Sequence, residues 1–237
     1  MGRNYVMSDI HGMSDLLKKM LDMIQPDADD RVYILGDMID RGPDPAGVLD
    51  LAMNCPNITA LRGNHEDGFV EWYEAPDRDR YPYYYNTYDV LCADARWRKK
   101  IPEYVDFMKT LPLCAKVKTG GECWLLAHAS TEEILHIWKR KERLLWDTSM
   151  IDRQRGIPGY MSVVGHVPTF LIRGTRNEPA TIWHCPDGRL IDVDCGAVFA
   201  EAGGRLGCLC LETGKEYYVS AADGQSGDID QDIERDR

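Results

Sequence analysis

The chain has 237 residues and a formal net charge of −11, with 44% hydrophobic and 28% charged residues; these values are ordinary for a globular protein and allow one large α/β domain. The acidic balance argues against non-specific binding to nucleic acid or to an anionic membrane, because both surfaces would repel the chain. No stretch approaches the ~20 apolar residues that span a bilayer, and the eight cysteines lack a C-x-x-C pair, so we expect a soluble, cytoplasmic protein with reduced thiols.

The first sixty residues alternate between strand and helix patterns. Residues 3–9 are predicted to form a strand, and residues 14–24 place apolar side chains at helical spacing. A second strand at 32–35 precedes a helix at 46–53, and a third strand covers 58–61. This alternation indicates βαβ units and a largely parallel sheet, in which ligand sites lie in the loops beyond the carboxyl ends of the strands.

The rest of the chain changes character twice. Residues 68–112 are rich in tyrosine and tryptophan and are predicted to be a helical insertion that covers one side of the site. Short, turn-bounded strands then suggest a second sheet; they lie at 123–127, 161–164, 181–183, 190–193, 206–211 and 217–219. We expect one domain over residues 1–224, followed by an acidic tail, 225–237, whose polar composition predicts disorder.

Side chains that can bind metal follow the ends of five predicted strands. They are Asp9, His11, Asp37, Asn64, His128 and His166. Carboxylate, imidazole and amide donors without thiolates suit Mn²⁺, Fe or Zn²⁺ at a catalytic site better than a structural zinc. Two cations that share one carboxylate and one hydroxide can activate that water against a phosphate ester, and we place Asp37 between the two cations.

Two further residues near these ligands suit phosphate chemistry. Arg41 offers a planar fork of donors that matches phosphate oxygens, although a loop salt bridge to Asp40 or Asp44 would also account for it. His65 adjoins Asn64, and we expect it to donate a proton to the leaving oxygen while Asp40 holds its ring.

Several motifs together resemble the PPP-type metallophosphoesterases, in particular the bacterial and bacteriophage-type Ser/Thr protein phosphatases. They are S-D-I-H-G (8–12), G-D-M-I-D-R-G (36–42), G-N-H-E (63–66), H-A (128–129), G-H-V-P (165–168) and I-D-V-D-C-G-A-V-F (191–199). The resemblance spans about residues 4–219. It implies the calcineurin-like metallophosphoesterase fold, which is α/β with two stacked mixed β-sheets flanked by helices, and two divalent metal ions with manganese as the usual activator.

The resemblance also implies a role for each matched residue. Asp9, His11 and Asp37 would hold the first metal, whereas Asp37, Asn64, His128 and His166 would hold the second. His65 with Asp40 would be the acid pair.

The sequence departs from the family pattern at two places. Many diesterase relatives close with G-H-x-H, but here Gly165-His166 is followed by Val167, which favours cleavage of monoesters. Bacteriophage-type members carry a second phosphate-binding arginine two residues after a tryptophan, but Thr148 follows Trp146 at that spacing. Arg153 or Arg155, in the loop before the strand that delivers His166, is our candidate substitute.

Three functions remain open at this point. The first is a protein phosphatase for Ser and Thr phosphates, with Tyr phosphate as a further substrate, that uses a metal-bridging hydroxide as nucleophile. The second is a hydrolase of dinucleoside polyphosphates or other small phosphorylated metabolites. The third is a pseudoenzyme that binds phosphorylated partners without turnover. We expect a phosphoprotein or a small phosphorylated substrate as partner, and neither nucleic acid nor a membrane.

Overall fold

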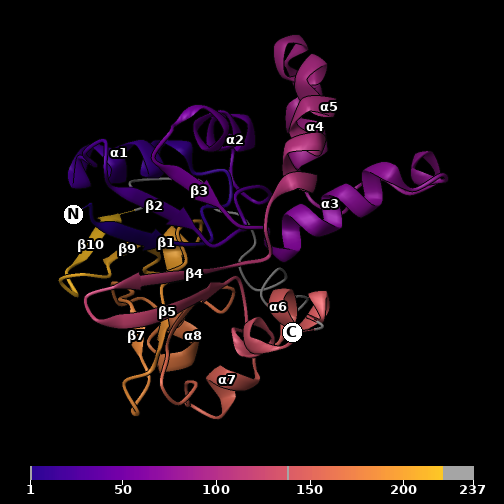
Figure 1. Ribbon diagram of the computed structural model, residues 1–237. Coiled ribbons are helices and arrows are strands. Elements are labelled where there is room, and N and C mark those ends of the chain that lie inside the picture. Colours follow the sequence, from indigo (N-terminus) through magenta and orange to yellow (C-terminus); the bar gives the residue numbers. More distant parts are fainter. Residues whose placement is uncertain (1, 138, 221–237) are drawn as a thin grey trace.

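The computed structural model describes residues 2–137 and 139–220, which form two stacked five-stranded sheets with helices on their outer sides (Figure 1). Both sheets mix parallel and antiparallel pairs, so the expected fold, α/β with two stacked mixed β-sheets flanked by helices, is confirmed. The tail predicted at 225–237 lies outside the described residues. No helix in the described ranges is long and apolar enough to cross a membrane.

The first sheet has the strand order β10-β9-β1-β2-β3. Its three parallel strands are β1 (Asn4–Met7), β2 (Arg31–Ile34) and β3 (Ile58–Ala60), and β9 (Arg205–Cys210) and β10 (Glu216–Ser220) add antiparallel pairs. The connecting helices α1 (Ser14–Ile24) and α2 (Pro45–Asn54) cover its outer face. Asp44 caps α2 by accepting a hydrogen bond from the Gly47 N–H, and Pro45 suits the first helical position because it needs no hydrogen-bond partner there.

The second sheet has the strand order β4-β5-β6-β8-β7. Its strands are β4 (Cys114–Thr119), β5 (Glu122–Ala127), β6 (Met161–Val164), β8 (Leu190–Asp192) and β7 (Trp183–His184). Short helices connect or follow these strands, namely η2 (Glu132–Leu135), α6 (Lys141–Trp146), α7 (Ser149–Asp152), α8 (Thr169–Arg173) and η3 (Ala200–Ala202). β5, β6 and β8 run parallel, so this sheet also brings several carboxyl strand ends to one edge.

Side chains on β1 alternate between the two cores. Tyr5 and Met7 are buried against the helices of the first sheet, whereas Val6 points into the layer between the sheets. There it packs in a cluster with Leu126 and Val163 of the second sheet. The two-residue period of a strand therefore serves both cores from one short element and fixes the position of the loop that follows β1.

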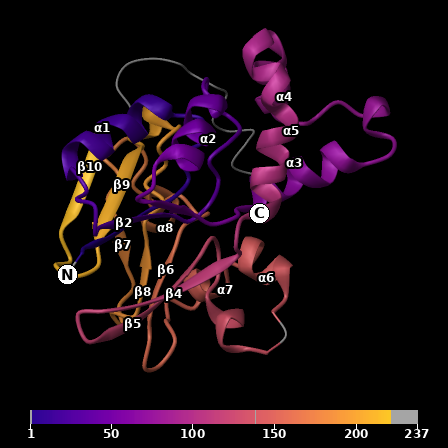
Figure 2. The ribbon, with the colours of Figure 1, turned by 45° about the horizontal axis from the view of Figure 1, so that its top comes forward.

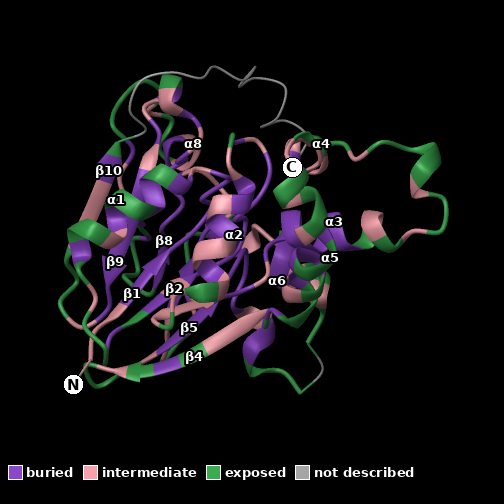
Figure 3. Cartoon of the chain, turned by 90° about the horizontal axis from the view of Figure 1, so that it is seen from above, coloured by how far each residue is buried: buried purple, intermediate pink, exposed green. Residues whose placement is uncertain are grey.

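The helical segment comprises α3 (Asn64–Glu74), η1 (Arg78–Arg80), α4 (Thr87–Ala93) and α5 (Ala95–Thr110). It stands out from the sheets as an arm in Figure 1 and Figure 2. Figure 3 shows that the arm is exposed at its far tip and buried where α3 and α5 meet the body of the molecule. Tyr104 and Met108 of α5 join the core of the first sheet, so the arm is anchored at its base.

The strands of the structure differ from the sequence prediction in two ways. The late strands do not all belong to a second sheet, because β9 and β10 return to pair beside β1 in the first sheet. The sequence pattern also does not predict β4, which pairs with β5. Its residues, Cys-Ala-Lys-Val-Lys-Thr, are small or charged apart from Val117, so the apolar alternation that marks a strand is weak there.

Candidate metal centre and active site

The six predicted metal ligands meet where the strands of both sheets end. Asp9 and His11 follow β1, Asp37 follows β2, and Asn64 begins α3 after β3. His128 and His166 follow β5 and β6 of the second sheet. Because parallel strands end at the same edge of a sheet, two stacked sheets bring these loops face to face. All six side chains are buried or nearly so.

Four of these donors form one cluster. The Asn64 Oδ1 atom lies 2.6 Å from His128 Nε2 and 3.2 Å from His166 Nδ1. The Asp37 Oδ2 atom lies 3.4 Å from His128 Nε2. The other ring nitrogen of His128, Nδ1, lies 3.1 Å from the Leu35 carbonyl oxygen, so Nδ1 donates to that oxygen and Nε2 is the nitrogen that can bind a metal ion in place of its proton. An amide oxygen, a carboxylate oxygen and two imidazole nitrogens therefore face one small volume.

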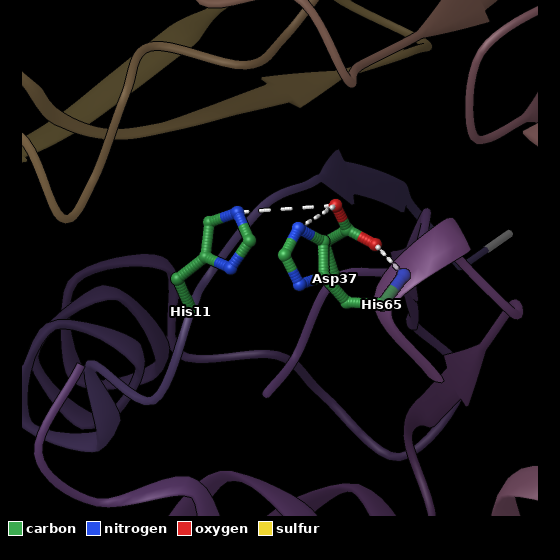
Figure 4. A group of neighbouring side chains, drawn as sticks. All are labelled: His11, Asp37 and His65. Atoms are coloured by element: carbon green, nitrogen blue, oxygen red, sulfur yellow. Dashed lines mark hydrogen bonds and ion pairs between the residues drawn. The ribbon is translucent and has the colours of Figure 1, made fainter. Parts of the chain in front are cut away.

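A second group shares Asp37 with the first. The His11 Nε2 atom lies 3.8 Å from Asp37 Oδ2 and 3.9 Å from Asp9 Oδ1. His11 Nδ1 lies 2.8 Å from the Ile39 carbonyl oxygen, so Nε2 again faces the cluster as the lone-pair nitrogen. The single oxygen Asp37 Oδ2 therefore lies within 4 Å of both His11 Nε2 and His128 Nε2. Figure 4 shows the side chains of His11 and Asp37. This position suits a carboxylate that bridges two cations.

The electrostatics of the cluster favour bound cations. Burial and the charge of Asp37 raise the pKa of Asp9 to about 6, although the charge of His128 opposes the rise. Burial lowers the pKa of His128, but the carboxylates of Asp37 and Asp9 outweigh it and raise the value to about 9. Buried carboxylates that raise the affinity of a buried imidazole for a proton also raise the affinity of the site for a divalent cation.

His65 lies beside this cluster and is tied to Asp40. Its Nδ1 atom is 2.7 Å from Asp40 Oδ2. Its Nε2 atom is 3.8 Å from Asp37 Oδ2, and Figure 4 shows these two side chains. Its backbone N–H also donates to Asp37 Oδ1 at 3.1 Å. Arg41 contacts the His11 ring through Nη1, so the structure brings the predicted acid pair and the predicted phosphate-binding arginine to the metal cluster.

Sequence reasoning missed the role of Glu66. This fully buried carboxylate accepts hydrogen bonds from the backbone N–H groups of Asp37 at 2.9 Å, Met38 at 2.7 Å and Gly63 at 2.8 Å. It therefore ties the loop after β2 to the start of α3. The signal was available, because Glu66 occupies the third helical position, where a glutamate reaches back to the residue that caps the helix.

Two tyrosines of the helical segment were also missed. The Tyr83 hydroxyl donates to Asp40 Oδ2 at 2.7 Å, and the Tyr85 ring packs on the His65 imidazole with 4.5 Å between ring centroids. No local sequence signal identifies them, because the segment holds many tyrosines. Only the three-dimensional structure shows that these two contact the site.

The site loops carry unusual backbone conformations. Nine non-glycine residues have positive φ angles within the described ranges, and six of them are site residues, namely Asp9, His11, Asp37, Asp40, Arg41 and His166. Non-glycine residues with positive φ are uncommon and cost energy that the surrounding structure must offset. Their concentration here indicates that the loops are shaped for placing side chains.

Close packing of glycines keeps these loops in place. Gly63 lies against Asp37, and a Cβ atom at position 63 would meet Asp37 Oδ1 at 2.1 Å and Asp37 N at 2.5 Å. Gly165 lies against Asp9 in the same way, with Asp9 Oδ2 2.4 Å from the position of an added Cβ atom. Only glycine therefore fits where the loops that carry the ligands cross.

A recess of about 620 Å³ opens beside the cluster. His11, Arg41 and His166 line it, and Thr148, Asp152 and Asp194 add polar groups. Its remaining wall is apolar and consists of Trp146, Ile151, Val167, Pro168, Leu171 and Phe199. The Trp146 ring meets the His166 ring edge to face, with 5.8 Å between centroids.

The expectation that Arg153 or Arg155 replaces the missing arginine is not supported. Both residues line a different recess, together with Glu132 and His136. Arg153 Nη2 pairs with Glu132 Oε1 at 2.5 Å, and its Nε donates to the Ser149 carbonyl at 3.0 Å. The loop after α7 therefore places both arginines at a recess other than the one beside the candidate metal cluster, which sequence distance from β6 alone could not reveal.

Comparison with known proteins gives the family context. The calcineurin-like phosphoesterase profile matches residues 3–187 of the chain. The chain is similar to the symmetrical bis(5'-nucleosyl)-tetraphosphatase of Acidovorax sp., with 28% identity over 162 residues that cover 66% of this chain and 54% of that protein. The match therefore spans about half the length of that curated relative.

Two further similarities, one in sequence and one in fold, are as follows. Serine/threonine-protein phosphatase 1 of Salmonella typhimurium is 28% identical over 209 residues, which cover 85% of this chain and 88% of that protein. A Saccharomyces cerevisiae protein serine/threonine phosphatase has the same fold, with a TM-score of 0.65 and 13% identity over 94% of this chain and 81% of that one.

Proposed function

The chain belongs to the calcineurin-like phosphoesterase family, and from that premise we propose that it is a phosphomonoesterase with two divalent metal ions that acts on phosphoproteins. The proposed substrates are phosphoserine and phosphothreonine side chains, with phosphotyrosine as a further substrate. The similarity to serine/threonine-protein phosphatase 1, which extends over most of both chains, supports this choice.

The donor set fits the metals that the family implies. Asp9, His11 and Asp37 would hold one ion. Asp37, Asn64, His128 and His166 would hold the other. When bound, the two ions supply a water of lowered pKa and neutralise charge on the phosphate. Oxygen and imidazole donors without thiolates suit manganese, which we propose as the activating metal.

Arg41, His65 and Asp40 carry the remaining steps. Arg41 lies in the recess next to His11, where its guanidinium would hold two oxygens of the phosphate and orient the ester. His65 would donate a proton to the leaving oxygen as the ester bond breaks, so that an alcohol rather than an alkoxide departs. Asp40, bonded to His65 Nδ1, orients the ring and stabilises its protonated form.

The charge of the recess is the observation that carries the substrate proposal. Arg41 is the one guanidinium or ammonium group among the described residues that line it, and Thr148 stands where related phosphatases place a second arginine. A dinucleoside polyphosphate brings several adjacent negative charges that need cationic partners. Two carboxylic groups, Asp152 and Asp194, and a mostly apolar wall suit a single phosphate on a less charged carrier.

The alternative, hydrolysis of dinucleoside polyphosphates, is favoured by the similarity to the Acidovorax tetraphosphatase. The test is a side-by-side turnover assay of phosphoserine and phosphothreonine peptides and diadenosine tetraphosphate with purified protein and Mn²⁺. We expect kcat/KM to be about 10-fold or more higher for the phosphopeptides, equivalent to about 1.4 kcal/mol. A preference for diadenosine tetraphosphate would overturn the proposal.

A variant sharpens this assay. Thr148→Arg adds a guanidinium to the recess and should move the ratio of kcat/KM values toward the more highly charged substrate. An unchanged ratio would mean that the charge of the recess does not select the substrate.

A further inference from the structure

The acid pair has a third member that comes from the helical segment. Asp40 is fully buried, and its Oδ2 atom accepts hydrogen bonds from both His65 Nδ1 and the Tyr83 hydroxyl, each at 2.7 Å. Its Oδ1 atom has no hydrogen-bond partner among the described residues. Asp40 is thus held at one oxygen by two donors, one from the start of α3 and one from the segment before α4.

We propose that Tyr83 is a positioning residue for proton donation, because its hydroxyl fixes the Asp40 carboxylate that in turn orients His65. This inference rests on the proposed function of His65 as the proton donor. It assigns the helical segment a part in the reaction in addition to its packing.

Tyr83 is itself held firmly. Its ring meets Phe69 edge to face, with 4.9 Å between centroids, and lies 5.0 Å from the Trp72 ring. Both partners belong to α3, the helix that carries His65. The Trp72 indole donates to the Tyr81 carbonyl at 2.8 Å, which ties the chain just before Tyr83 to the same helix. The tyrosine and the histidine therefore share one rigid support, and little ordering is needed to bring them together.

The residues after Tyr83 also contact Asp40 and His65. The Asp40 N–H donates to Thr87 Oγ1 at 2.8 Å, so both the backbone and the side chain of Asp40 are bound by this segment. The Tyr85 ring packs on His65 and lies 5.7 Å from the Arg41 guanidinium carbon. Tyr83, Tyr85 and Thr87, from the turn before α4 and its first residue, thus each contact Asp40 or His65.

The charge state of Tyr83 suits this role. Burial and the negative charge of Asp40 raise the pKa of Tyr83, so the phenol stays neutral and keeps its proton for the hydrogen bond. Removal of the hydroxyl would leave Asp40 Oδ2 with His65 as its remaining donor. With Oδ1 unbonded, the carboxyl group could then turn, and His65 would spend less time aimed at the leaving oxygen.

The test compares Tyr83→Phe with Tyr88→Phe. Tyr88 belongs to the same aromatic group, with its ring 4.8 Å from Trp72, but its hydroxyl bonds Cys92 rather than the acid pair. We expect Tyr83→Phe to lower kcat about 10-fold for an alkyl phosphate, equivalent to about 1.4 kcal/mol. The loss should be smaller for p-nitrophenyl phosphate, whose leaving group needs less protonation. Tyr88→Phe should leave both rates unchanged.

A double-mutant cycle separates this inference from the proposed function. In a His65→Asn background, Tyr83→Phe should cost no further activity, because a residue that acts through His65 has nothing left to position. Equal losses in both backgrounds, or no difference between Tyr83→Phe and Tyr88→Phe, would overturn the inference. If His65→Asn itself has no effect on alkyl phosphates, the proposed function of His65 fails first. Bound metal and the thermal midpoint, measured for every variant, show whether a loss comes from unfolding.

Discussion

The loops at the strand ends and the helical segment contribute to the site in different ways. The loops bring five candidate metal ligands together from both sheets, and the sixth candidate, Asn64, is the first residue of α3. The helical segment contributes His65 at the start of α3 and two tyrosines that fold back from its far side. A change in the loops should therefore remove metal, whereas a change in the helical segment after Asn64 should leave metal bound and impair proton donation.

The largest expected effect is that of Asp37→Asn. Asp37 Oδ2 lies 3.4 Å from His128 Nε2 and 3.8 Å from His11 Nε2, so its charge serves both groups of donors. We expect a loss of activity on the order of 10³-fold or more, accompanied by loss of bound metal in elemental analysis. A variant that kept two metals per chain would show that Asp37 does not bridge them.

His65→Asn should separate proton donation, the role of the helical segment, from metal binding, the role of the loops. We expect kcat to fall by roughly 10²–10⁴-fold for alkyl phosphates, which is the usual contribution of a positioned proton donor, and less for p-nitrophenyl phosphate. Metal content should stay at the wild-type value. Loss of metal instead would make His65 a ligand, a role that its 3.8 Å separation from Asp37 Oδ2 also allows.

Two glycine variants compare Gly63, which lies against Asp37 just before α3, with Gly68 inside α3. Gly63→Ala places a Cβ atom 2.1 Å from Asp37 Oδ1, so Asp37 must move, and we expect a fall in kcat of about 10²-fold, as a small displacement of a catalytic group can cause. At Gly68, five residues later in α3, an added Cβ atom would have no atom of the described residues within 4 Å apart from the backbone of its own helix. Gly68→Ala should keep full activity and raise stability by up to about 1 kcal/mol. Similar kinetics for the two variants would contradict the packing described here.

The smallest effects are expected for Arg153→Ala and Arg155→Ala. Both arginines line the recess near His136 rather than the one beside the metal cluster. We expect each variant to keep kcat/KM for a phosphopeptide within about twofold of wild type, or about 0.4 kcal/mol. A 10-fold loss in either would mean that the loop before β6 moves toward the substrate during the reaction.

The same two regions show what the sequence could predict. The candidate ligands can be predicted from their order, because Asp37 and Asn64 come two or three residues after apolar runs and the ends of parallel strands must converge. Tyr83 was not identified, because its contact with Asp40 spans 43 positions and depends on how the chain turns between α3 and α4. Glu66 lay within a recognised motif, but its three backbone hydrogen bonds appear only when the loop after β2 is in place.

Backbone geometry explains a further limit of sequence reasoning. Residues two apart in an extended chain share one face, but Asp9 and His11 both have positive φ angles, 54° and 46°, so the chain turns sharply there. Their side chains still converge, because the loop after β2 holds them through backbone hydrogen bonds from the Asp9 N–H to the Gly36 carbonyl and from the His11 N–H to the Asp37 carbonyl. The residue pattern indicated the chemistry, whereas the local conformation depends on contacts between distant loops.

The central claim is that the strand-end loops of both sheets hold two divalent ions that the reaction requires. The most direct measurement follows p-nitrophenyl phosphate hydrolysis by purified protein after exhaustive chelation and during stepwise addition of Mn²⁺, with bound metal determined in parallel. The account predicts negligible activity in the chelated protein and full recovery as occupancy approaches two ions per chain. Full activity after chelation, or recovery complete at one ion per chain, would contradict it.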